Sequence, residues 1–282
     1  MSYKGVDVSE FQGSINWDNL KPFIDFAIIR GGYGYDTLDA KAHRNLSECK
    51  RLGIPYGIYW FSYALSTSDA VREAHSLCDL ADKYEPTYPL CFDFEYDSDR
   101  YAIQNGVYHT YSSREAIAKA FLSTVESRGY YAMIYTNPDY MSKGFGGLTD
   151  RYDLWLAEWD VRNPRCSCGI WQYGSDSFGN YSGLDANISY NDYPSIIAGM
   201  SPSPSPTPSP TPSPSPSPTP STNYRERILK YFNDEQYDNY YNKALEVIQG
   251  KYGIGDERKR LIRGQGYDYE VVQELVNYIM GY

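Results

Sequence analysis

The chain has few of the residues that bind metals. Among its 282 residues are three histidines and five cysteines, Cys49, Cys78, Cys91, Cys166 and Cys168. An odd number of cysteines, three of them inside apparent helices or strands, indicates reduced thiols rather than a disulfide framework. No histidine lies near Cys166 and Cys168 at the spacing of a zinc site, so we expect no metal and no cofactor.

Long apolar runs and an excess of positive charge are also missing. No stretch is long and apolar enough to cross a membrane, so we expect no membrane partner. The first five residues lead directly into a predicted strand, without the apolar region of a signal peptide, which predicts synthesis in a cytoplasm without export. The net charge of -10 argues against nucleic acid as a partner, because phosphate binding requires a basic surface.

Aromatic residues, in contrast, are abundant. The chain contains 31 tyrosines and 5 tryptophans, and its hydrophobic content of 41% is enough for a substantial core. Many of these rings are expected to pack inside the fold, and others suit stacking on sugar rings.

Serine or threonine alternates with proline throughout residues 201–220. Such a segment cannot form a core and favours an extended, polyproline-like spacer. The sequence therefore predicts a large domain over 1–200, a linker over 201–222 and a small domain over 223–282.

Strand-like and helix-like segments alternate in the large domain. The predicted strands are Gly5–Val8, Phe26–Arg30, Tyr56–Tyr63, Leu90–Tyr96, Tyr131–Tyr135, Leu154–Trp159, Gly169–Tyr173 and Gly183–Ile188. The clearest predicted helices are Ala40–Leu52, Thr67–Lys83 and Arg114–Arg128, the last with Ser112 or Ser113 as its N-cap. This order predicts an α/β fold, a TIM-like parallel (β/α) barrel. Because the later helices are short, we expect the barrel to be incomplete or flattened on that side.

The small domain has the pattern of short amphipathic helices. They are predicted at Arg225–Tyr231, Tyr240–Gln249, Glu257–Arg263 and Tyr269–Met280, with glycines between them. The sequence therefore predicts an all-α bundle of three or four helices.

The segment Cys91–Tyr96 places two carboxylates, Asp93 and Glu95, inside an apolar, strand-like run. Alternation along a strand puts Asp93 and Glu95 on one face. Two neighbouring carboxylates repel each other, so a fold alone does not favour them. A glycosidase requires such a pair, with one group protonated as an acid and the other ionised beside an oxocarbenium-like centre.

Catalytic groups of such barrels lie at the carboxyl-terminal ends of the strands. Four acidic residues meet this condition on the first, fourth and eighth predicted strands: Asp7, Asp93, Glu95 and Asp185. Other strand ends carry candidates for a sugar-binding cleft: Tyr59, Tyr135, Trp155, Gln172 and Tyr173. Packing in the mouth of the barrel is the alternative role for these five.

Seven short motifs resemble glycoside hydrolase family 25 in its own order. They are Gly5-Val6-Asp7-Val8-Ser9, Pro55-Tyr56-Gly57-Ile58-Tyr59, Phe92-Asp93-Phe94-Glu95, Tyr135-Thr136-Asn137, Leu154-Trp155-Leu156-Ala157, Trp171-Gln172-Tyr173 and Gly183-Leu184-Asp185-Ala186-Asn187. Each motif is weak alone, but together they are specific and cover nearly all of 1–195. The resemblance implies a lysozyme that cuts peptidoglycan between N-acetylmuramic acid and N-acetylglucosamine on a (β/α) barrel.

The resemblance also implies roles for the four acids. Glu95 would be the proton donor, and Asp93, Asp7 and Asp185 would complete the acidic cluster. Asp93 acts either as the nucleophile or by orienting the 2-acetamido group of the substrate for attack. The resemblance points to net retention of configuration.

The C-terminal residues resemble the CW_7 cell-wall-binding repeat, through Val247–Arg258, Gly266–Tyr269 and Val272–Asn277. The repeat implies binding to the disaccharide-peptide unit of peptidoglycan. Our candidates for contact are Lys251, Tyr252, Arg258 and Tyr267. Residues 223–236 fit no known pattern and add either a helix or a surface for self-association. Met200 offers an internal start that would produce a free binding module.

These features together favour a modular phage endolysin. It would be made in the host cytoplasm, act at the cell wall after release, and target Gram-positive bacteria, whose thick wall is exposed. The alternative is a non-catalytic, lectin-like wall protein, which would have no reason to retain four acids. A chitinase-like barrel is a poor match, because Tyr88 and Cys91 stand where its longer acidic motif requires aspartates.

Overall fold

The computed structural model describes residues 2–200, 240, 243–244, 246–247, 251–252 and 255–280. The chain divides into two compact units, Met1–Ser203 and Pro204–Tyr282, which are considered separately. The predicted linker, the helix at 225–231 and the segment 223–236 lie outside the described residues. Within the described part, no helix has the length and apolar character needed to cross a membrane.

The first unit is a closed barrel of eight strands. The strands are β1 (Tyr3–Val8), β2 (Phe26–Tyr33), β4 (Tyr56–Phe61), β5 (Leu90–Asp93), β6 (Ala132–Thr136), β7 (Asp153–Ala157), β8 (Ile170–Phe178) and β9 (Tyr181–Ser189), with the short β3 (Thr37–Leu38) added beside β2. The ring closes because β1 pairs with β2 on one side and with β9 on the other. The mixed α/β barrel is therefore confirmed, and the expectation of an incomplete ring of strands is wrong.

One strand of the barrel is antiparallel, where the sequence predicted parallel strands throughout. β8 and β9 form a hairpin joined by Gly179 and Asn180, and Gly179 has φ 61°. Two residues suffice for an antiparallel turn, whereas a parallel crossover needs a dozen or more. The short spacing between the two strands thus determines the direction of β9.

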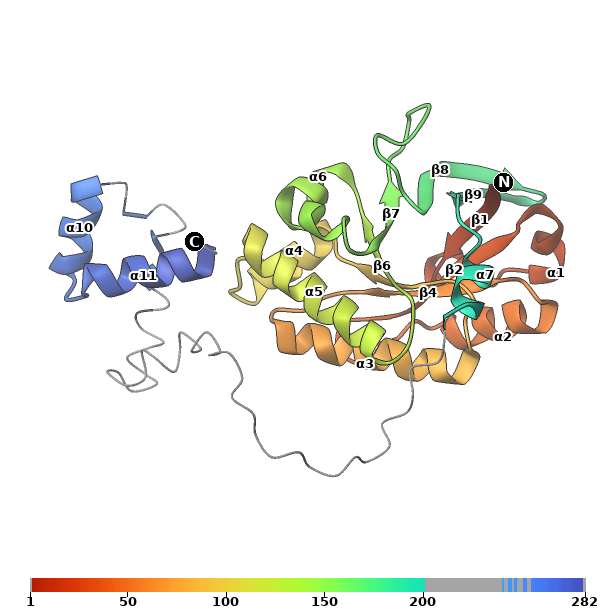
Figure 1. Cartoon of the computed structure of the whole chain (residues 1–282), viewed down its shortest axis with the longest axis horizontal. Helices are drawn as coiled ribbons and strands as arrows, with labels where there is room; N and C mark the ends of the chain where they lie inside the picture. The colour runs from red at the N-terminus through yellow and green to blue at the C-terminus, as the bar shows by residue number, and fades with distance from the viewer. Residues whose placement is uncertain are drawn as a thin grey trace, which may run out of the picture. The chain divides into compact units, whose positions relative to one another are not determined.

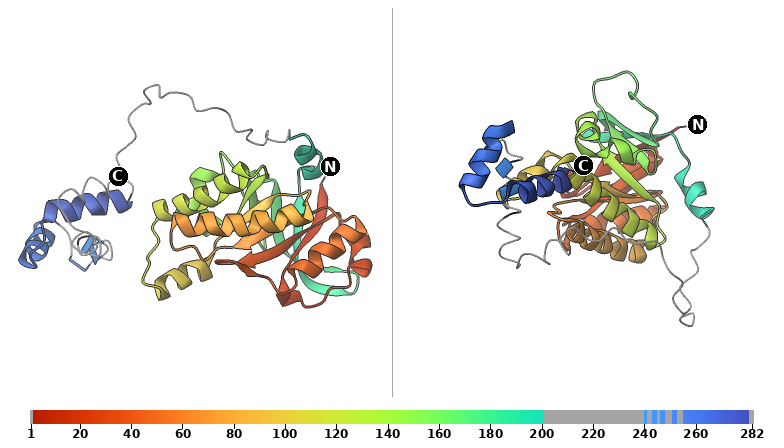
Figure 2. Two further views of the ribbon diagram at one scale, coloured as in Figure 1. Left: turned by 90° about the horizontal axis from the view of Figure 1, so that it is seen from below. Right: turned by 60° about the vertical axis from the view of Figure 1, so that its left-hand side comes forward.

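Helices cover the barrel unevenly. They are α1 (Trp17–Leu20), α2 (Ala42–Leu52), α3 (Thr67–Tyr84), α4 (Tyr96–Gln104), α5 (Tyr111–Ser127), α6 (Pro138–Tyr140) and α7 (Tyr193–Ala198), with short turns η1 (Glu10–Gln12), η2 (Lys21–Phe23), η3 (Met141–Phe145) and η4 (Gly146–Leu148). Figure 1 and Figure 2 show α3 and α5 side by side along one flank. No long helix follows β6, β7 or β8. The short later helices therefore leave the outer helical layer thin on that side, while the ring of strands inside it is complete.

Alternation along the strands separates two apolar layers. Residues such as Val6, Ile29 and Phe92 point outward and pack against the helices in the larger cluster. Phe26, Met133 and others point inward and fill the barrel. Asp7 and Asp93 lie on inward-facing positions of β1 and β5, so the barrel interior becomes polar towards one end.

The second unit contains α10 (Gly255–Gly264) and α11 (Tyr269–Met280), and Tyr240, Lys243, Ala244, Glu246 and Val247 are also helical. A small apolar cluster joins Ala244, Val247, Tyr252, Ile262, Val272, Leu275 and Val276. The complete bundle stays a prediction, because much of residues 223–254 lies outside the described part.

Candidate active site

A cleft of about 340 Å³ opens at the carboxyl-terminal ends of the parallel strands. Its lining includes Asp7, Asp93, Glu95 and Asp185, the four acids predicted from the sequence. It also includes Tyr59, Tyr135, Trp155 and Gln172, four of the five predicted sugar-binding residues. The barrel thus brings together residues that are up to 178 positions apart, whereas their catalytic roles stay predictions.

Asp93 and Glu95 reach the cleft by different means. Asp93 is the last residue of β5, and Glu95 is the N-cap of α4, so the predicted strand ends three residues earlier than expected. The backbone of Glu95 is still extended, with φ -132° and ψ -166°. Phe94 turns outward into the apolar layer between them, so the alternation that the sequence predicted continues beyond the strand.

Burial and mutual repulsion affect the proton affinity of these acids. Asp93 is 5% exposed, and burial raises its pKa well above the usual value, with Glu95 and Asp7 raising it further. Burial also raises the pKa of Glu95, while a hydrogen bond from Tyr135 lowers it. Each carboxylate disfavours a second negative charge nearby, so the cluster retains protons near neutral pH.

Asp7 lies in a network of amide donors. Its Oδ2 accepts hydrogen bonds from Gln172 Nε2 at 2.9 Å and from Asn187 Nδ2 at 2.8 Å. Burial raises the pKa of Asp7 to about 7, with Asp185 adding to the rise, although both amides oppose it. Asn187 is fully buried, and its Oδ1 accepts from Trp155 Nε1 at 2.8 Å.

Gln172 connects the two sides of the cleft. Its Oε1 accepts from Trp159 Nε1 at 3.0 Å and lies 3.2 Å from the hydroxyl oxygen of Tyr135, while its Nε2 donates to Asp7. The indole N–H of Trp159 can only donate, so it fixes which end of the amide faces Asp7. Gln172 therefore positions Asp7, Tyr135 and Trp159 relative to one another.

Tyr173, the neighbour of Gln172, does not line the cleft, so the prediction that it binds sugar there is wrong in placement. Its ring packs against Trp171 at 5.6 Å, and its hydroxyl donates to Asp176 Oδ2 at 3.0 Å. Side chains alternate along β8, so Gln172 points inward and Tyr173 outward. The prediction assigned both Gln172 and Tyr173 to the cleft, although neighbouring residues of a strand point to opposite faces.

Several cleft residues were missed by the sequence reasoning. Arg30 is 7% exposed and binds Asp39 Oδ2 at 2.7 Å and Glu10 Oε1 at 2.8 Å. Its position in β2 has the same parity as the inward-facing Ile28, which could have revealed it. Phe11 and Trp159 line the cleft from connecting segments, where no periodicity marks them.

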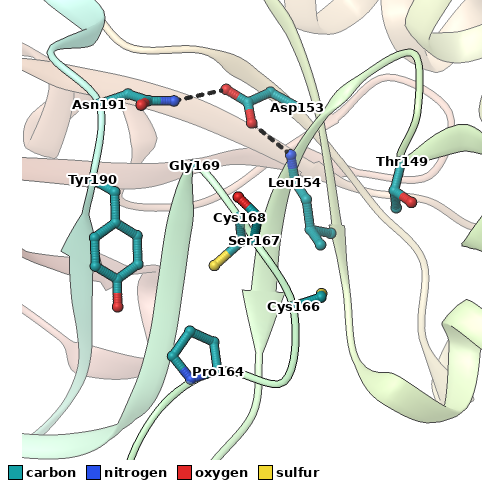
Figure 3. Close-up of a pocket in the computed structure, with 10 residues that line it drawn as sticks. All are labelled: Thr149, Asp153, Leu154, Pro164, Cys166, Ser167, Cys168, Gly169, Tyr190 and Asn191. Carbon is teal, nitrogen blue, oxygen red and sulfur yellow. Dashed lines mark hydrogen bonds between the residues drawn. The ribbon is translucent and has the colours of Figure 1, made fainter.

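Another cavity, of about 510 Å³, lies where β7 and β8 begin and β9 ends, away from the acids. Figure 3 shows Asn191 directed at Asp153, with Nδ2 and Oδ2 3.3 Å apart, and Cys166 and Cys168 on the connecting loop. Asp153 is the one carboxylate in this lining, and it also accepts from Tyr193 at 2.5 Å. With no second acid, this cavity lacks the pair that glycoside hydrolysis requires.

In the second unit, the predicted contact residue Tyr252 is 8% exposed and belongs to the apolar cluster. Its hydroxyl lies 2.8 Å from both Lys243 Nζ and Glu246 Oε2. Tyr252 is therefore a core residue, and its ring is not available to a ligand. Lys251 is exposed and pairs with Glu246 at 3.2 Å, while Tyr267 stacks edge-on against Tyr240.

An eight-stranded barrel with paired acids and aromatic side chains at its carboxyl-terminal end has the composition of a glycosidase cleft. Comparison with known proteins agrees. Residues 6–182 match Glycosyl hydrolases family 25, and the chain belongs to this family. Residues 243–280 match the CW_7 repeat. The prediction of a glycosidase with a cell-wall-binding repeat is confirmed.

Individual relatives are similar mainly over the barrel. Lysozyme M1 of Streptomyces globisporus is 24% identical over 213 residues, which are 67% of each chain. The modular autolysin LytC from Streptococcus pneumoniae, solved with a synthetic peptidoglycan ligand, is 25% identical with a TM-score of 0.57. The match covers 67% of this chain but only 47% of LytC. The catalytic domain of endolysin ply40 from bacteriophage P40 of Listeria monocytogenes shares the fold, at 22% identity and TM-score 0.56, over 71% of this chain and 98% of that domain.

Proposed function

We propose that the protein is a muramidase that hydrolyses the β-1,4 bond between N-acetylmuramic acid and N-acetylglucosamine in peptidoglycan, with net retention. The observation that carries the proposal is the presence of Glu95 and Asp93 in one cleft with raised pKa values. Family membership and the peptidoglycan-directed names of the relatives support the choice of substrate.

Glu95 is the general acid. It is half-buried at the edge of the cleft, and burial raises its pKa, which favours the protonated form that an acid for the leaving oxygen requires. The Tyr135 hydrogen bond stabilises the carboxylate that forms after proton transfer. Glu95 can then act as the base that activates water in the second step.

For Asp93 we favour orientation of the 2-acetamido group over direct attack. Its Oδ1 is buried and has no hydrogen-bond partner among the described residues, although it lies at the cleft. A substrate N–H would satisfy this oxygen. Direct attack would require Asp93 to be ionised, whereas burial, Glu95 and Asp7 all raise its pKa. Accepting an N–H requires only a lone pair, which a protonated carboxyl also offers.

The test is digestion of purified Gram-positive peptidoglycan, followed by reduction and mass spectrometry of the products. The wild type should release fragments that end in reduced N-acetylmuramic acid, and Glu95→Gln should release roughly 100- to 10,000-fold less. Glu126→Gln, which removes a charge paired with Arg151 outside the cleft, is the matched control. Fragments that end in reduced N-acetylglucosamine would show that the enzyme cleaves the other glycosidic bond of the strand. Pelleting with the wall but no release by the wild type would favour the lectin-like alternative.

Retention is tested separately by following the anomeric signal of a fresh product by NMR. An initial β-anomer is expected, because two successive displacements preserve the configuration. An initial α-anomer would rule out both roles considered for Asp93.

The biological setting that fits this architecture is lysis of a Gram-positive host by a phage endolysin. The CW_7 repeat would hold the enzyme on the wall, with contacts from Lys251, Arg258 and Tyr267. Storage in the host cytoplasm, release late in infection and self-association through the C-terminal unit belong to the same proposal. Sedimentation velocity and intact mass of the purified chain test self-association and the internal start at Met200.

A further inference from the structure

A second hollow of about 460 Å³ lies beside the catalytic cleft, where β2 and β4 end. We call it the tyrosine pocket. Four of its lining residues are tyrosines, and the others, apart from Leu65, are small or polar. The lining is Tyr33, Gly34, Tyr35, Thr37, Tyr63, Leu65, Asp69, Arg72, Glu73 and Tyr101. It is a hollow of ligand-binding size at the end of the barrel that carries the acids.

The tyrosine pocket neighbours the catalytic cleft, and residues of the two linings are in contact. Arg30 lines the cleft, and its guanidinium lies 5.4 Å from the ring centre of Tyr33. Phe61 also lines the cleft, and its ring centre lies 5.1 Å from that of Tyr63. Side chains of the two linings thus pack against each other, which places the tyrosine pocket next to the cleft.

The tyrosine rings are arranged as walls with accessible faces. Tyr63 lies 4.8 Å from Tyr101 and 6.2 Å from Tyr33, edge to face in the second case. Tyr35 is 66% exposed and Tyr101 39% exposed. Tyr35 also carries the guanidinium of Arg72 at 4.8 Å, which fixes one face of its ring. Exposing apolar ring faces of this size to water is unfavourable in free energy, and a ligand that covered them would remove that surface from water.

The polar groups of the tyrosine pocket carry no free positive charge. Arg72 is paired with Asp69, and Glu73 is buried, with hydrogen bonds from Ser62 Oγ and the Tyr63 backbone N–H. Burial raises the pKa of Glu73 to about 7, so this carboxyl is partly protonated at neutral pH. An anionic peptide stem would find no unpaired cation in this lining, because the guanidinium of Arg72 is already paired with Asp69. A neutral ligand with hydroxyl and amide groups would be paired.

We propose that the tyrosine pocket binds a neutral N-acetylhexosamine unit of the glycan strand at a position away from the bond cleaved in the catalytic cleft. A pyranose ring has an apolar face that suits the tyrosine rings, and an edge of hydroxyl and acetamido groups that suits Asp69 and Arg72. This inference rests on the proposed function and makes the enzyme selective for longer glycans.

The experiment compares two peptide-free glycans of alternating N-acetylglucosamine and N-acetylmuramic acid, a tetrasaccharide and an octasaccharide. The full-length Tyr35→Ala/Tyr101→Ala variant removes the two most exposed rings of the pocket. Tyr190→Ala is the matched control, because Tyr190 is 42% exposed and lines the cavity at the opposite end of the barrel. We expect the double variant to lose roughly five- to tenfold in kcat/KM on the octasaccharide and nothing on the tetrasaccharide.

Three results would overturn the inference: no loss on either glycan, an equal loss on both, or a loss confined to strands that carry peptide stems. The last would assign the pocket to the peptide. Failure of the wild type to cleave either glycan would contradict the proposed function instead. In that case the affinity of each variant for the octasaccharide, measured by calorimetry, still tests the pocket: it should be lower for the double variant than for Tyr190→Ala. Tyr35→Leu/Tyr101→Leu, which keeps apolar volume without the rings, repeats the test if alanine lowers the midpoint of thermal unfolding.

Discussion

Asp7 and Asp185 lie directly opposite each other in the antiparallel pairing of β1 with β9. Like charges at opposed positions destabilise a sheet, and the charge of Asp185 adds to the rise that burial causes in the pKa of Asp7. The barrel tolerates the pair because Gln172 and Asn187 each donate a hydrogen bond to Asp7. A structural role alone would favour a neutral residue at either position, so the pair indicates function.

The first prediction concerns stability against pH. The pKa of Asp7 is raised from 3.8 to about 7. Its contribution to folding is therefore complete below about pH 4 and is lost as the pH rises through 7. Asp7→Asn should raise the free energy of unfolding at pH 8 relative to the wild type by roughly 1–3 kcal/mol, with little gain at pH 4. Urea denaturation at the two pH values measures this.

Asp150→Asn is the control for this measurement, because Asp150 is exposed and lies outside the cleft. It should leave the pH dependence of stability unchanged. A gain for Asp7→Asn that is equal at both pH values would mean that something other than the carboxyl charge limits stability.

The second prediction concerns the pH dependence of activity. The Tyr135 hydroxyl stabilises the ionised form of Glu95 and so lowers its pKa. Removing this hydroxyl in Tyr135→Phe should raise the pKa of Glu95 and move the alkaline limb of the kcat/KM profile to higher pH. Tyr131→Phe is the control, because the Tyr131 hydroxyl binds Asp153 rather than a cleft residue. If the alkaline limb of the profile stayed in place or moved to lower pH, the assignment of Glu95 as the general acid would be contradicted.

Much of the site followed from the sequence because the signals were local. The period of two within Cys91–Glu95 placed Asp93 and Glu95 on one face, and this held even though β5 ends at Asp93. The expectation that Asp7 and Asp185 both lie at carboxyl-terminal strand ends placed them in one cleft. However, β9 is antiparallel, so Asp185 reaches the cleft from the middle of its strand, opposite Asp7.

The features of the site that the sequence did not predict depend on contacts between distant segments. No local pattern shows that Asn187 reaches both Asp7 and Trp155, because those contacts exist only once the barrel closes. The N-cap of α5 is Thr110, not Ser112 or Ser113, because Ser113 is the third helical residue and bonds back to Thr110. Three neighbouring hydroxyl residues made that boundary ambiguous from the sequence.

The third prediction separates wall binding from catalysis. Lys251 is exposed in the C-terminal unit and its ammonium pairs with Glu246 at 3.2 Å. Lys251→Ala should weaken pelleting with purified walls by about fivefold, as expected for one exposed charge, and leave cleavage of soluble glycan unchanged. Lys119→Ala, an exposed lysine on α5, should change neither quantity. Pelleting that is indifferent to Lys251→Ala would place the contact surface elsewhere on the repeat.

The last prediction concerns Phe11 at the rim of the catalytic cleft. Phe11 is 80% exposed, yet its ring is held 4.7 Å from the guanidinium of Arg30, which Glu10 and Asp39 fix in turn. An apolar ring fixed in water at a cleft is suited to hold a sugar. Because its ring carries no group that takes part in the reaction, it should bind substrate and transition state alike.

Phe11→Ala should therefore raise KM by roughly three- to tenfold on soluble glycan, while kcat stays within about twofold. Phe11→Trp should restore KM, because it retains an aromatic face. Phe23→Ala is the matched control, since Phe23 is 48% exposed and contacts the β8–β9 turn at Gly179 rather than the cleft. A fall in kcat with KM unchanged would mean that Phe11 acts through Arg30 on the acids, and not by holding the substrate.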